Sequence, residues 1–102
     1  MIRGTTPTIK LKAKFDLRNW NIYVTLKQGL TEYTFENDEL EIEFIDEFSI
    51  VSFTLTQEQT LSFNDNNKVE IQLRAAKDGS AIASKIATVD VYRILKGGII
   101  DG

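Results

Sequence analysis

The chain contains no cysteine, no histidine and only one proline among its 102 residues. Without cysteine there can be no disulfide framework, no thiol nucleophile and no thiolate metal site. Without histidine, the usual general base and the commonest metal ligand are also missing. These absences remove most kinds of enzyme chemistry. We therefore expect a protein that is not an enzyme, with no catalytic residue, no metal site and no cofactor.

Long apolar runs and an excess of positive charge are lacking as well. The longest apolar runs span only a few residues, far short of a membrane-spanning helix. Residues 1–7 include a basic residue but no apolar segment, so they do not look like a secretory signal. The net charge of −3 gives no overall bias toward nucleic acid. We expect neither a membrane nor a nucleic acid as partner.

The chain does have the composition of a globular domain, with 42% hydrophobic and 26% charged residues. Its dominant periodicity is two, which is typical of strands with one buried and one solvated face. Seven short strands with turns between them predict an all-β fold, an antiparallel two-sheet β-sandwich that is immunoglobulin-like. An open barrel is the second choice. The predicted strands are 8–15, 20–28, 31–36, 39–44, 48–55, 68–76 and 81–92.

Local signals add a helical turn and a hairpin to this pattern. Thr56 is followed three residues later by Gln59, and the two can exchange hydrogen bonds as a capping box, which predicts one helical turn near 56–60. Asp78-Gly79 is the strongest hairpin signal, because both central positions of a type I′ turn need positive φ. We divide the chain into an extended N-terminal arm (1–7), a sandwich domain (8–93) and a C-terminal tail (94–102).

The last predicted strand changes phase along its length. Ile82 and Ile86 fall on one side of the strand, whereas Ala87, Val89 and Val91 fall on the other. One extra residue in a strand reverses the face that the following residues occupy. The pattern therefore predicts a β-bulge near Ser84 or Lys85.

Charge is unevenly distributed along the chain. Residues 1–31 carry six basic side chains against Asp16 alone, whereas residues 32–65 carry ten acidic side chains and no basic one. Alternate residues of a strand share a face, which makes a row of Lys10, Lys12 and Lys14 and a row of Glu39, Glu41 and Glu43. If their strands are neighbours, the rows pair across the sheet. If they are not, the molecule has a basic and an acidic face and can stack head to tail on its own copies.

The two ends of the chain are candidate contact segments. Gly4, two threonines and Pro7 favour an extended arm that is free to lie across the sheet edge of a neighbour. The tail has four large aliphatic residues, more than a solvent-exposed tail normally shows. Either Ile94 and Leu95 close the end of their own sandwich, or the tail docks elsewhere.

The aromatic residues offer a binding surface of a different kind. Trp20 is in phase with Ile22, which places it in the core. Tyr23 faces outward and, with Tyr33, could form a sugar-stacking surface. The lysine row has no exposed aromatic residues between its members, which argues against binding of nucleic acid.

Three further patterns are interpreted as structural. The glutamate row lines a solvated strand face, whereas glycoside hydrolysis needs two carboxylates across a cleft, so an enzyme would require a pair such as Glu41 and Glu43 in a pocket. The turn at 64–67 has oxygen ligands but lacks the glycine and closing glutamate of a calcium loop. Gly97-Gly98 is not followed by a helix that could hold phosphate.

Four segments of the sequence together carry a resemblance to known proteins: MIRGTTPT at 1–8, FTLTQEQTLSF at 53–63, VEIQLR at 69–74 and DGSAIAS at 78–84. They resemble small proteins encoded in tailed phages and prophages of Gram-positive bacteria. Segment 1–8 is also similar to the N-terminal domain of phage baseplate upper proteins. The resemblance implies a β-sandwich and a structural or assembly role in the virion, and it implies no catalytic residue.

The leading hypothesis is a non-enzymatic module of a phage or prophage tail, baseplate or connector that acts through protein–protein contacts. Its partners would be other virion proteins or copies of itself, the latter making a homo-oligomer. It would be located in the virion after synthesis in the bacterial cytoplasm. The alternative is a carbohydrate- or ligand-binding β-sandwich module on a host-facing structure. Besides the two charged rows, the expected contact residues are Arg3, Thr5, Thr6, Pro7, Tyr23, Ile94, Leu95, Ile99 and Ile100.

Overall fold

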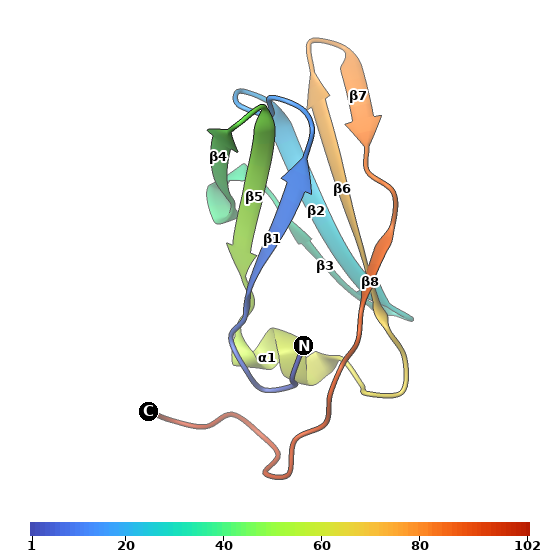
Figure 1. Ribbon diagram of the computed structural model, residues 1–102. Helices are drawn as coiled ribbons and strands as arrows, with labels where there is room; N and C mark the ends of the chain where they lie inside the picture. Colours follow the sequence, from blue (N-terminus) through green and yellow to red (C-terminus); the bar gives the residue numbers. More distant parts are fainter.

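Two antiparallel sheets face each other across an apolar interior in the computed structural model, which describes residues 1–102 (Figure 1). The smaller sheet has the order β1-β5-β4 and consists of β1 (Thr8–Ala13), β4 (Glu41–Ile45) and β5 (Phe48–Thr54). The larger sheet has the order β3-β2-β6-β7, and β8 also pairs with β6. Its strands are β2 (Asn21–Gln28), β3 (Thr31–Phe35), β6 (Val69–Lys77), β7 (Ser80–Ala83) and β8 (Ala87–Val89).

The order of the strands is that of an immunoglobulin-type domain. Such domains place strands B, E and D in one sheet and C′, C, F and G in the other. The same arrangement results when β1 to β7 are taken as B, C, C′, D, E, F and G. The predicted immunoglobulin-like β-sandwich is thus confirmed, with eight strands instead of seven because the last predicted strand is divided in two.

The predicted bulge divides that last strand. Three residues separate Ala83 from Ala87, whereas only two separate their partners Arg74 and Ile71 on β6. Ser84 holds the interruption, because its amide donates to the Leu73 carbonyl at 2.8 Å and its hydroxyl accepts from the Leu73 amide at 3.0 Å. The following Ile86 is left 57% exposed instead of entering the core.

Two short helical segments begin with capping boxes. In α1 (Gln57–Ser62) the Thr56 hydroxyl accepts from the Gln59 amide at 3.1 Å, and the Gln59 side chain accepts from the Thr56 amide at 2.9 Å, as predicted. The second segment, η1 (Asn37–Glu39), was expected to be partly strand. The fourth strand begins only at Glu41. The Glu39 carboxylate accepts from the amide of Glu36, the residue before η1, at 3.4 Å and so keeps this stretch in a capped 3₁₀ turn.

The core draws on both sheets and on the segments that join them. Fifteen apolar residues are buried, among them the inward-facing residues of β2, β5 and β6 and also Phe63, which follows α1. The inward residues of β1 are only half-buried, because β1 lies at a sheet edge. Phe15 was expected to be buried but is 55% exposed, since β1 ends at Ala13. Leu17 is fully buried instead.

Two buried polar side chains fix connecting loops to the sandwich. Ser49 of β5 is fully buried, where its hydroxyl donates to the Phe15 carbonyl at 2.5 Å and accepts from the Leu17 amide at 2.8 Å. Gln28 of β2 bonds three backbone groups of the turn at 64–67, namely the Asn64 amide and the carbonyls of Asn64 and Asn67. Both loops therefore take their shape from a distant strand.

Candidate interaction surfaces

The N-terminal arm is docked on its own chain. The Arg3 amide donates to the Tyr92 carbonyl at 3.0 Å, and the Tyr92 amide donates to the Met1 carbonyl at 2.8 Å, so the arm pairs in parallel with the segment that follows β8. The terminal ammonium group of Met1 also donates to the Asp90 carbonyl at 2.7 Å. The expectation that residues 1–7 are free to lie across a neighbour is thus wrong.

The candidate residues of the arm are held by α1 and by Leu55, the residue that follows β5. The Arg3 guanidinium donates to the Leu61 carbonyl at 2.9 Å, and the buried Thr60 hydroxyl donates to the Thr5 carbonyl at 2.9 Å. The Leu55 amide donates to the Pro7 carbonyl at 3.0 Å. Several backbone groups of the arm are therefore already bonded within the chain, which holds the arm in place against its own domain.

The C-terminal tail is attached much more loosely. Only one of its aliphatic residues, Ile94, is half-buried, and it lies against Gly4 and Leu61. Leu95 is 94% exposed, so the expectation that both residues close the sandwich holds for Ile94 and is wrong for Leu95. The chain then extends beyond α1 (Figure 1), and its end carries the exposed Ile99 and Ile100.

A single side chain connects the end of the tail to the domain. The Gln57 amide group donates to the Ile100 carbonyl at 2.9 Å, and the Ile100 amide donates back to the Gln57 carbonyl oxygen at 2.9 Å. These bonds fix the backbone of the tail while its aliphatic side chains remain in water. Three exposed large aliphatic residues, Leu95, Ile99 and Ile100, within one short segment make it a candidate contact surface.

The lysine and glutamate rows lie on the same outer face of the smaller sheet. Their strands, β1 and β4, are both edge strands, and β5 lies between them. The rows are therefore neither direct neighbours nor on opposite faces. Residues of the two rows align with the same residues of β5, and the aligned sets are Lys10–Ser52–Glu41 and Lys12–Ile50–Glu43.

The ends of the rows extend beyond the strands. Lys14 follows the last residue of β1, and Glu39 belongs to η1. The two ion pairs of the structure join Asp16 to Arg18 and Lys68 to Asp90, so neither includes a member of a row. The one specific contact of the lysine row is with an aromatic ring of β5, since the Lys12 ammonium lies 4.1 Å from the Phe48 ring centroid.

The two tyrosines of the proposed sugar-stacking surface do not lie together. Tyr23 is on the outer face of the larger sheet, where it alternates with the buried Ile22 and Val24. Tyr33 pairs with the buried Leu26 and faces inward, its hydroxyl donating to Ser62 at 2.7 Å. The sheet thus separates the two rings, and Tyr23 is the exposed one.

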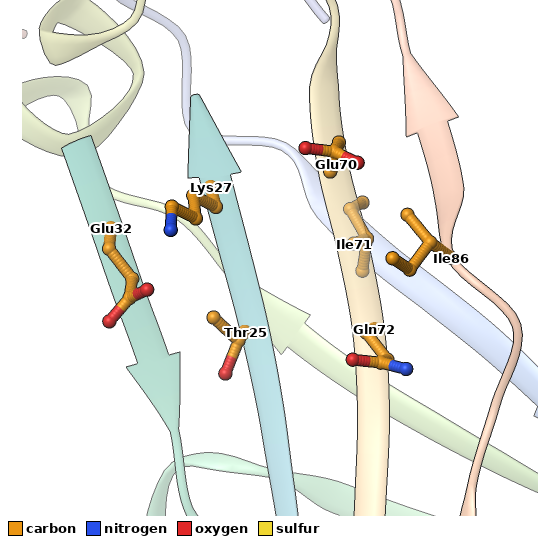
Figure 2. A pocket seen from close by; sticks show the side chains of 7 residues that line it. All are labelled: Thr25, Lys27, Glu32, Glu70, Ile71, Gln72 and Ile86. Carbon is orange, nitrogen blue, oxygen red and sulfur yellow. The ribbon is translucent and has the colours of Figure 1, made fainter. Parts of the chain in front are cut away.

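The outer face of the larger sheet also has a shallow hollow, shown in Figure 2. Its volume of about 220 Å³ is below the range of about 300–1,000 Å³ that is usual for small-molecule sites. Lys27 of β2 lies between Glu32 and Glu70 in the cross-strand register, so the floor is charged, with one more acidic than basic side chain. The hollow is therefore a polar sheet surface with Ile86 at its border.

A compact charged cluster lies in the loop after β1. The Arg18 side chain donates to both oxygens of the Asp16 carboxylate, at 2.8 Å and 2.6 Å, and these hydrogen bonds lower the pKa of that carboxyl from 3.8 to about 2. The same guanidinium lies 4.6 Å from the ring centroid of Phe44 on β4. We did not single out this cluster from the sequence, where the spacing Asp-x-Arg was its only signal.

No group of three or more Asp or Glu side chains is placed to hold a metal ion. No helix of the structure combines the length and the apolar composition that a membrane crossing requires. No family of known proteins matches the chain, and no curated protein is significantly similar to it.

Proposed function

We propose that this protein is a non-enzymatic module of a phage or prophage particle, in its tail, baseplate or connector, that acts through protein–protein contacts. The observation that carries the proposal is the exposed apolar tail, in which Leu95, Ile99 and Ile100 project from a backbone held by Gln57. Apolar side chains that are ordered but uncovered suit burial against another protein. The resemblance of four segments to phage and prophage proteins supplies the setting.

The architecture supports an assembly role in a second way. The buried core contains no residue of the tail, and residues 95–102 bond to the domain only through Gln57. The tail can therefore bind a partner while the sandwich stays folded. Burying a large aliphatic side chain contributes about 1.5–3 kcal/mol, so three of them supply a useful part of a specific contact. The partner would be another virion protein with an apolar groove.

The test is a binding measurement with the virion proteins encoded next to this one. The full chain is titrated against each purified neighbour by calorimetry, together with a variant in which Leu95, Ile99 and Ile100 are replaced by serine. We expect one neighbour to bind the full chain and to bind the variant at least about tenfold more weakly, the loss that about 1.4 kcal/mol produces.

A matched control replaces three exposed residues away from the tail, Tyr23, Leu30 and Ile86, by serine. This variant should bind the neighbour as the full chain does. Equal weakening by both triple variants, or no binding to any tail, baseplate or connector protein, would contradict the proposal.

A further inference from the structure

The smaller sheet has two free edges of opposite charge. β1 and β4 each pair only with β5, so the outer edge of each strand is unpaired. The β1 edge carries the lysine row and the β4 edge the glutamate row. Unpaired backbone groups along a strand form a template for another strand, and the side chains beside them decide which strand is accepted.

The charges discriminate between the possible pairings of two copies. Two β1 edges would place lysine beside lysine, and two β4 edges would place glutamate beside glutamate, which is unfavourable in both cases. Only β1 of one copy beside β4 of another brings unlike charges together. A symmetric dimer through these edges is thus disfavoured, and a head-to-tail arrangement is favoured.

The register and direction of the strands fit this arrangement. β1 and β4 are both antiparallel to β5 and hence parallel to each other, so a copy displaced sideways places its β4 parallel to β1. Lys10 and Glu41 share the level of Ser52 on β5. The same displacement therefore sets Lys10 beside Glu41 of the next copy, and likewise Lys12 beside Glu43, one strand spacing of about 4.8 Å away.

The residues around each edge carry charge of the same sign as the edge itself, acidic near β4 and basic near β1. The segment that leads through η1 to β4 carries Glu36 and Asp38 as well as the glutamate row. On the opposite side of the sandwich, Lys85 joins Lys12 at a hollow of about 190 Å³ between β1 and the bulge. This hollow is mostly apolar, with Leu11, Leu73 and Ala87 in its wall, so a neighbouring copy can bury apolar surface there as well.

We propose that the β1 edge of this protein binds the β4 edge of a second copy, which extends the smaller sheet from molecule to molecule. The pairing rests on the proposed function, because it names the lateral contact of an assembly module. It leaves the C-terminal tail free for the other partner. Since each copy keeps one free edge of each kind, association continues beyond a dimer to a ring or a filament.

The experiment measures mass by light scattering over a concentration series. We expect the average mass of the wild-type protein in solution to rise from the 11.6 kDa of one chain to beyond the mass of a dimer as the concentration increases. Raising the salt from about 0.1 M to about 1 M should shift the rise to higher concentration, because the screening length falls from about 10 Å to about 3 Å. A rise that stops at the dimer overturns the head-to-tail arrangement.

Charge reversal identifies the edges. One variant carries Lys10→Glu, Lys12→Glu and Lys14→Glu, and a second carries Glu39→Lys, Glu41→Lys and Glu43→Lys. Each alone should weaken self-association at least about tenfold, because like charges then meet at the contact, and an equimolar mixture of the two should restore it. Circular dichroism of each variant establishes that it is folded.

A control of the same net charge replaces Lys68, Lys77 and Lys96 by glutamate, away from the β1 edge. It should associate as the wild type does. Failure of the mixture to restore association, or equal weakening by the control, overturns the pairing. The serine variant of the tail keeps its self-association if the pairing is right, so binding to a virion protein and edge pairing can fail separately.

Discussion

The sequence predicted two segments outside the sandwich, one at each end of the chain, but in the structure only the N-terminal arm is bonded to the domain at several points. Residues 1–3 pair with the backbone near Tyr92, and residues 3–7 bond to α1 and to Leu55. The tail from residue 95 onward has bonds to the domain only through Gln57. The arm is thus part of the fold, whereas the tail is an attached segment.

The difference shows that apolar content does not decide which end is docked. The tail is the more apolar end, with Leu95, Ile99 and Ile100 exposed to water. The arm is held because its backbone groups find partners, including the buried Thr60 hydroxyl. Ordering a chain end costs conformational entropy, and several hydrogen bonds together offset that cost for the arm.

Deletion of each end tests this comparison most strongly. Removing residues 1–5 should lower the free energy of unfolding by about 2–4 kcal/mol, because the arm makes several hydrogen bonds at about 0.5–1.5 kcal/mol each. Removing residues 95–102 should lower it by less than about 1 kcal/mol, since the only bonds lost are two solvent-exposed ones to Gln57, whose side chain can bond water instead. Urea unfolding of both variants measures the two values. Equal losses would contradict the distinction between the ends.

A glycine at each end gives a finer test at the same backbone conformation. Gly4 has φ of +71° and Gly98 has φ of +80°, the left-handed region that costs other residues about 1–2 kcal/mol. A Cβ atom added at Gly4 would lie 3.2 Å from the Ile94 side chain, whereas a Cβ atom added at Gly98 would have no neighbouring atom within 4 Å.

We expect Gly4→Ala to destabilise the protein by about 1–2 kcal/mol. Gly98→Ala should stay within about 0.5 kcal/mol of the wild type, because the tail can change its backbone without disturbing the domain. Thermal unfolding of the two variants side by side measures the difference. A stable Gly4→Ala variant would show that the arm also adjusts freely.

The hydroxyl that anchors the arm has a smaller expected effect. Thr60→Val keeps the shape of a buried side chain and removes the donor to the Thr5 carbonyl, which should cost about 1 kcal/mol. Thr54→Val is the matched control, since its hydroxyl bonds that of Thr8 on the exposed face and should matter by less than about 0.5 kcal/mol. Chemical denaturation of both variants measures the two losses in free energy of unfolding. A larger loss for Thr54→Val than for Thr60→Val would show that the arm is anchored elsewhere.

The smallest expected effect is the loss of stability at low pH that comes from the Asp16–Arg18 pair. This loss should not depend on the arm or the tail. The pKa of Asp16 is lowered to about 2 by Arg18, so this pair stabilises the fold above the ordinary pKa of 3.8 and loses its contribution as the pH falls toward 2. The unfolding midpoint of Asp16→Asn should lie slightly below that of the wild type at pH 7 and coincide with it near pH 2. The deletion variants should show the same dependence, because this loop lies at the end of the sandwich opposite α1 (Figure 1).

The sequence predicted the elements of the fold better than their contacts. Alternation fixed the faces of β2, β5 and β6, and the phase change in residues 81–92 placed the bulge at Ser84. The end of β1 was missed because Phe15 continues the alternation, although the chain already turns toward the Ser49 hydroxyl there. The residues near Phe15 alone do not reveal a bond to a side chain on a distant strand.

The interaction surfaces were predicted only in part, for the same reason. The two charged rows were identified, but whether they meet depends on the order of the strands, which alternation does not reveal. Nothing in residues 1–7 indicated that Tyr92 and Thr60 would bond the arm. Contacts between segments so far apart in the chain depend on how the sheets and the helix pack.

The bulge between β7 and β8 also bears on how this protein stays selective about its neighbours. Long, flat edges recruit any exposed strand and lead to aggregation. Strands of four and three residues, interrupted at Ser84, make a poor template of this kind. The larger sheet is thereby blunted along its β7–β8 edge, which makes that edge a poor site for the addition of a strand from another molecule.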